Sequence, residues 1–72
     1  MRQHWEDEWQ ALVRERDAAL ARSQRIQDEI TDSIRRRQPP AMRLMRAADA
    51  AEAELVAIRA RIRDFLQQLR SA

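Results

Sequence analysis

Apolar side chains recur at alternating spacings of three and four residues along two long stretches of the chain. This spacing places them on one face of an α-helix, and its persistence over about four heptads is typical of a coiled coil. We therefore expect one helix over about residues 5–37 and a second over about 41–69. The first series is Trp5, Trp9, Leu12, Arg16, Ala19, Ser23, Ile26 and Ile30, and the second is Leu44, Ala48, Ala51, Leu55, Ile58, Ile62, Phe65 and Leu69.

A break at Gln38-Pro39-Pro40 separates the two stretches. Proline lacks a backbone N–H donor and keeps the preceding residue out of the helical conformation, so the first helix must end by about Gln38. Pro40 fits the first turn of a following helix. We predict a short turn over residues 38–40, at which the chain doubles back.

The two series match each other when the helices run antiparallel. If residues whose numbers sum to 74 are placed side by side, six apolar pairs form, and a shift of one residue loses most of them. The sequence thus predicts an all-α fold, an antiparallel two-helix coiled-coil hairpin that makes a single domain over residues 1–72. The six pairs are Trp5–Leu69, Trp9–Phe65, Leu12–Ile62, Ala19–Leu55, Ile26–Ala48 and Ile30–Leu44.

Each helix also carries a second line of apolar residues beside the first. In a lone hairpin each helix has only one neighbour, which cannot cover both lines. We expect the surplus to be buried by a second hairpin, giving a homodimeric four-helix bundle, or by a helix of another protein; the simpler interpretation is ordinary core packing. The second lines are Val13, Leu20 and Ile34 in the first helix and Met45, Val56 and Leu66 in the second. The residues predicted for partner binding or self-association are Trp5, Trp9, Val13, Leu20, Ile34, Met45 and Leu66.

The core that one copy of the chain can build is thin. Of the 72 residues, 44% are hydrophobic, but 13 of these 32 residues are alanine. A chain this short buries only about 60% of its unfolded surface, and it has no cysteine for a disulfide. Association with a second copy or with another protein is the remaining means of stabilisation.

Arginines cluster around the predicted turn, although the net charge of the whole chain is only +2. Three interpretations are open. The arginines complement the C-terminal dipole of the first helix; or they lie beside the acidic residues 6–8 of a second copy packed head to tail; or their guanidinium groups hold phosphates or carboxylates of a partner. This basic tip consists of Arg35, Arg36, Arg37, Arg43 and Arg46, and no acidic residue lies between Ser33 and Ala48.

Two polar residues interrupt the apolar seam of the first helix. Arg16 falls opposite Ile58 in the predicted pairing, where a charge is costly unless it reaches solvent or finds a partner. Ser23 lies near Gln27 and Glu52, with which it can form one hydrogen-bonded layer. We expect Arg16 and Ser23 to set the register of the packed helices, as single polar seam residues do in coiled coils.

The composition excludes several kinds of site. Without glycine there is no phosphate-binding loop, and without cysteine there is no zinc ribbon or thiol nucleophile. His4 is the only histidine, and the carboxylates do not cluster as catalytic pairs do. We therefore expect no metal, no cofactor and no catalytic residue. The longest apolar runs are about four residues, as at 55–58, too short for a membrane span, and we expect a cytoplasmic protein.

In length and expected architecture the whole chain resembles two groups of small bacterial proteins. One group is the dimeric helical-hairpin RNA regulators of plasmids, and the other is the two-helix chaperones that hold needle subunits of type III secretion systems. No motif of either group is matched residue by residue, so no functional residue carries over. The first resemblance implies an RNA partner and the second implies a protein partner.

These patterns predict a non-enzymatic protein–protein interaction module, such as an adaptor, a small chaperone or an assembly factor. It would act through an apolar helix face, with Ile26, Leu55, Ile58 and Ile62 supplying burial. The alternative is an RNA-binding hairpin dimer that uses surface arginines, although most arginines outside the tip are interspersed with acids. A small all-helical enzyme, with Arg16 and a carboxylate lining a pocket, is the remote alternative.

Overall fold

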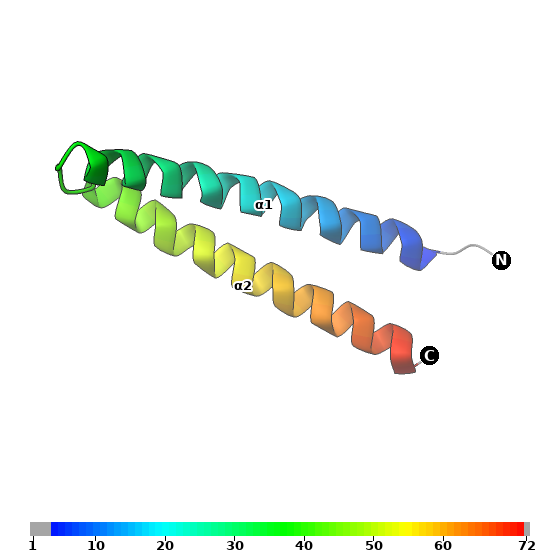
Figure 1. Cartoon of the computed structure of the whole chain (residues 1–72). Coiled ribbons are helices and arrows are strands. Elements are labelled where there is room, and N and C mark those ends of the chain that lie inside the picture. Colours follow the sequence, from blue (N-terminus) through cyan, green and yellow to red (C-terminus); the bar gives the residue numbers. More distant parts are fainter. Residues whose placement is uncertain (1–3, 72) are drawn as a thin grey trace.

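The chain folds into a helical hairpin. A computed structural model describes residues 4–71, in which α1 spans His4–Arg35 and α2 spans Met42–Ser71. The two helices pack against each other and run antiparallel, so both termini lie at one end of a rod (Figure 1). The rod measures 58 × 16 × 15 Å along its principal axes. We call the end with the connecting loop the tip and the end with the termini the open end.

The connection between the helices is longer than the turn expected over residues 38–40. Residues 36–41 are all non-helical, so α1 ends at Arg35 rather than near Arg37. The cause is Arg37, which adopts the left-handed conformation with φ of 59°. A residue in this conformation ends a helix and turns the chain away from its axis.

Two backbone hydrogen bonds fix this end of α1. The N–H of Arg37 donates to the carbonyl of Ile34 at 2.9 Å, and the N–H of Gln38 donates to the carbonyl of Ser33 at 2.9 Å. This pair of bonds is the Schellman motif, which satisfies carbonyls that the end of a helix leaves unpaired. Glycine usually occupies the left-handed position, but this chain contains none, and Arg37 takes it.

The start of α2 has weak capping. The carbonyl of Ala41 accepts hydrogen bonds from the N–H groups of Leu44 at 2.9 Å and Met45 at 3.2 Å, which makes Ala41 the N-cap residue. Alanine has no side-chain oxygen to accept a bond from the free N–H groups of the first turn. That turn also has no acidic residue. The start of α2 is therefore held by the proline-containing loop and by packing rather than by a side-chain cap.

The centre of the core is a small cluster in the middle of the rod. Ala19 is fully buried, Leu55 and Ile58 are 7% and 4% exposed, and Ile62 packs against them. Because alanine has no side chain beyond Cβ, the helices can approach closely at this level. The other buried apolar residues are Leu12, Leu44, Ala51 and Phe65.

Two pairs of the predicted register are seen directly, and Ala19 and Leu55 are one of them, packed in the central cluster. Trp9 stacks on Phe65 with ring centroids 6.0 Å apart and an interplanar angle of 24°, which confirms this pair of the predicted alignment. The next layer out is Trp5 and Leu69, whose exposed fractions are 42% and 39%. The helices diverge toward the termini (Figure 1), where these two side chains are exposed.

Within residues 4–71, no helix is both long enough and apolar enough to cross a membrane.

Candidate interaction surface

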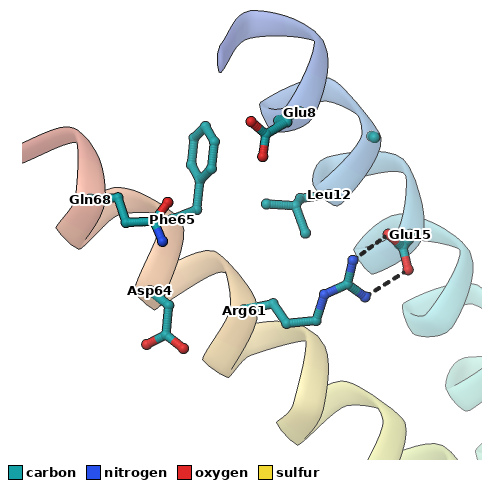
Figure 2. A pocket seen from close by; sticks show the side chains of 8 residues that line it. Glu8, Leu12, Glu15, Arg61, Asp64, Phe65 and Gln68 are labelled. Carbon is teal, nitrogen blue, oxygen red and sulfur yellow. Dashed lines mark hydrogen bonds and ion pairs between the residues drawn. The ribbon is translucent and has the colours of Figure 1, made fainter. Parts of the chain in front are cut away.

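Two ion pairs join α1 to α2 along one edge of the hairpin. Arg61 donates from both terminal nitrogens to the two carboxylate oxygens of Glu15, each at 3.0 Å (Figure 2). Arg22 donates to Glu54 from Nη2 at 2.6 Å and from Nε at 3.4 Å. Both pairs join residues whose numbers sum to 76, against 74 for the stacked pair Trp9 and Phe65, so residues with sums of 74 to 76 lie at nearly the same level along the hairpin. We call this side the ion-paired edge.

The Glu15–Arg61 pair also changes the acidity of its members. The hydrogen bonds from Arg61 lower the pKa of Glu15, and the hydrogen bonds to Glu15 raise the pKa of Arg61. Both side chains remain about half exposed, so water and salt screen their attraction. The pair therefore acts more as a constraint on register than as a source of stability.

A hollow lies on the ion-paired edge near the open end, where the helices diverge. Leu12 and Phe65 face each other across it, and polar side chains surround them (Figure 2). The carboxylates here are those of Glu8, Glu15 and Asp64, and Glu15 is already bound to Arg61. Among the described residues, no three potential metal ligands lie close enough to hold an ion.

The opposite edge of the hairpin is lined by residues of both helices. Ser23 and Gln27 of α1 lie in one shallow groove with residues of α2 that include Asp49, Glu52 and Val56. Gln27 follows Arg22 by five residues, which is about 140° around the helix. This groove is therefore on the far side from the ion pairs.

Large apolar side chains on this opposite edge are exposed. Leu20 and Ile34 lie two turns before and after Gln27, and they are 41% and 61% exposed. On α2, Val56 is 59% exposed and level with Leu20, while Val13 is half-buried. We call the full set the apolar face, and it consists of Val13, Leu20, Ile34, Met45, Val56 and Leu66.

The two tryptophans predicted for partner binding lie elsewhere. Trp9 is half-buried and packs on Phe65 within the hairpin. Trp5 is at the open end of the seam and is exposed. Neither belongs to the apolar face, because both follow the seam spacing of α1.

Two exposed residues were missing from the predicted partner-binding set. Val56 belongs to the apolar face, and its place in the second apolar line was the signal for it. Met42 is 67% exposed at the first position of α2 and is level with Ile34. Met42 lies two heptads before Val56, so the same heptad position was the signal for it.

The structure brings the basic tip together around the loop. Arg35 forms an ion pair with Asp32, one turn earlier, at 4.0 Å. All five tip arginines are exposed, and four of them form no ion pair with any residue in the described range, namely Arg36, Arg37, Arg43 and Arg46. The free N–H groups at the start of α2 add to the positive potential here.

Arg16 reaches both solvent and a carboxylate, as a charged seam residue needs to, whereas Ser23 does not form the expected layer. The guanidinium of Arg16 lies 3.3 Å from the carboxylate of Asp17, its neighbour in sequence, and its side chain is 39% exposed. Between residues 4 and 71, no hydrogen bond links Ser23 to Gln27 or Glu52; Gln24 instead donates to Asp28 at 3.0 Å. The expected hydrogen-bonded layer is therefore absent from the described hairpin.

Fold and surface together define a two-sided helical hairpin, with one edge tied by cross-helix ion pairs and the opposite edge presenting the apolar face. No known family model matches the chain, and no curated protein or solved structure matches it significantly.

Proposed function

We propose that this protein is a non-enzymatic protein–protein interaction module, serving as an adaptor, small chaperone or assembly factor. It binds a partner helix along the apolar face. The observation that carries this proposal is the contrast between the two edges. Ion pairs close one edge, whereas Leu20, Ile34 and Val56 stay exposed on the other.

The magnitudes favour a partner that covers most of this face. Fully burying a large aliphatic side chain contributes about 1.5–3 kcal/mol, and the side chains of the apolar face are already partly covered. Six of them therefore supply several kcal/mol, which is comparable to the cost of about 4–15 kcal/mol for immobilising two molecules. A short peptide touching one or two of these residues would not offset that cost, so the partner must run along the rod.

A capture experiment tests the module. Tagged wild-type chain, incubated with extract of its native cell, should retain a partner that Leu20→Glu and Val56→Glu variants release. Ala21→Glu and Ala53→Glu are matched controls, because these alanines are also exposed but face outward from the hairpin. Equal capture by the face variants and the controls would refute binding through the apolar face.

RNA binding is a second candidate function, supported by the four tip arginines without an ion-pair partner among the described residues. Phosphate contacts give steep salt dependence. If four arginines each neutralise one phosphate, affinity for a single strand should fall roughly 50-fold between about 50 and 200 mM salt. A titration of labelled RNA that shows no binding at the lower salt concentration would eliminate this candidate.

A further inference from the structure

We infer that the partner of the apolar face is a second copy of this chain, packed antiparallel, so that the tip of each hairpin lies beside the open end of the other. The inference rests on the proposed function and specifies its partner. The choice of a second copy as the partner, and its antiparallel orientation, follow from how charges are distributed along the apolar face and at the two ends of the rod.

Charges on the α2 side of this face are segregated by sign. Asp49 and Glu52 lie on the tip side of Val56, and Arg59 and Arg63 lie on the side of the open end. Asp49, Glu52, Val56 and Arg59 line one groove, and Arg63 lies one turn beyond Arg59. The face therefore has an acidic half and a basic half with exposed Val56 between them.

An antiparallel copy brings opposite charges together. Asp49 and Arg63 lie seven residues before and after Val56, which is about two helical turns in each direction. If a two-fold axis passes at the level of Val56, Asp49 comes level with the partner's Arg63, and Glu52 comes close to the partner's Arg59. Leu20 is level with Val56, so the exposed side chains of both copies meet at the axis.

The ends of the rod match in the same arrangement. The basic tip of one copy comes beside the start of α1 in the other, where Glu6, Asp7 and Glu8 are all exposed. A parallel arrangement would instead place tip against tip and Asp49 against Asp49. Charges of the same sign, including the two basic tips and the two Asp49 carboxylates, would then lie at the same level, which disfavours it.

These charges are not satisfied within one hairpin. No ion pair in the described part of the chain involves Asp49, Glu52 or Arg59, and Arg63 has only a 3.6 Å contact with the adjacent Asp64. The cross-helix pairs of the ion-paired edge, by contrast, are complete within one copy. The charges of the apolar face are thus available to a second copy.

Sedimentation equilibrium and a single spin label test both the partner and its orientation. The wild-type chain should be a dimer. In a Gln38→Cys variant labelled at the tip, the two labels should be separated by nearly the length of the rod, 58 Å. A parallel dimer would bring them to about one helix–helix spacing of 10 Å.

Charge exchange gives an independent test. Arg63→Asp should weaken the dimer about tenfold, because each of two symmetric sites changes from attraction to repulsion. Adding Asp49→Arg to the same chain should restore wild-type affinity. Arg25→Asp is the control, since Arg25 is exposed on α1 away from the apolar face, and helicity measured by circular dichroism checks that each variant folds.

Each outcome decides between the proposals. A dimer with distant labels and rescue by the double variant supports the antiparallel pair. Short label distances, or a failure of rescue, overturn it. A chain that remains monomeric at all concentrations also overturns it, whereas the interaction module survives that result if the apolar face still captures another protein in the extract experiment.

Discussion

Arg37 is the residue whose conformation departs furthest from its own preference. Its φ of 59° lies in the left-handed region, where a side chain beyond glycine costs roughly 1–2 kcal/mol. The chain accepts this cost because Gln38 precedes proline, and the helix must end before it. An arginine at this position adds charge to the basic tip, which glycine would not.

Replacing Arg37 with glycine should stabilise the hairpin by about 1 kcal/mol, because glycine adopts the left-handed conformation without steric cost. Thermal unfolding followed by circular dichroism measures the change. Arg36→Gly is the control. This substitution removes the same charge, but Arg36 does not have a positive φ. A lower midpoint for Arg37→Gly than for the wild type would contradict the steric explanation.

At the scale of the helices, the apolar seam and the ion-paired edge contribute differently to the stability and alignment of the hairpin. Alternating apolar residues bury the centre of α1 against α2, and the strongest burial is at Ala19 and Ile58. The two cross-helix ion pairs are exposed and lie beside this seam. Burial therefore supplies most of the packing energy, and the ion pairs fix which residues lie level.

Ile58→Val should destabilise the chain by about 1 kcal/mol, because the deleted methylene leaves a gap in the core. Ile34→Val removes the same group from a side chain that is 61% exposed and should cost less than about 0.5 kcal/mol. Urea unfolding at the lowest practicable chain concentration, where association is minimal, compares the two. Equal losses would show that Ile58 is not in the core of one hairpin.

Acid should weaken the link between the helices at Glu15. Hydrogen bonds from Arg61 lower the pKa of Glu15 in the folded chain. The stabilisation is therefore present above the ordinary pKa of 4.5 and is lost as pH falls through the lowered value. Between about pH 7 and pH 3, the thermal midpoint of the wild type should fall further than that of Glu15→Gln.

Glu29→Gln is the control for this measurement, because Glu29 forms no ion pair with residues 4–71. It should keep the full acid sensitivity of the wild type. If Glu15→Gln were as acid-sensitive as Glu29→Gln, the Arg61 contact would not contribute to folding in solution.

For the whole molecule, the main feature is how few of its apolar side chains are buried. Only seven apolar residues of the described chain are buried, and two of these are alanine. A two-helix rod has a large surface for its volume, so each helix has one protected side. If a second copy covers the apolar face, as we propose, it adds to this limited stability.

The thermal midpoint should accordingly rise with chain concentration, since binding that favours the folded state adds stability in proportion to the logarithm of concentration. Val56→Glu should abolish this dependence, and Ala53→Glu should preserve it. Scanning calorimetry over a hundredfold range of concentration makes the comparison. A wild-type midpoint that stays constant over this range would show that the folded chain does not self-associate.

The sequence determined the two helices, the position of the reversal and the seam, because helical periodicity and proline sterics are local properties that act before any tertiary contact forms. It identified Leu20 and Ile34 as surplus apolar residues for the same reason. Tertiary packing decided the rest. Arg37 ends α1 early because the loop must also satisfy the last carbonyls, and Trp5 stays exposed because the helices diverge. Glu15 and Arg61 pair only because the fold brings residues 46 positions apart into contact, and such a contact depends on the relative orientation of two helices, which neither helix encodes alone.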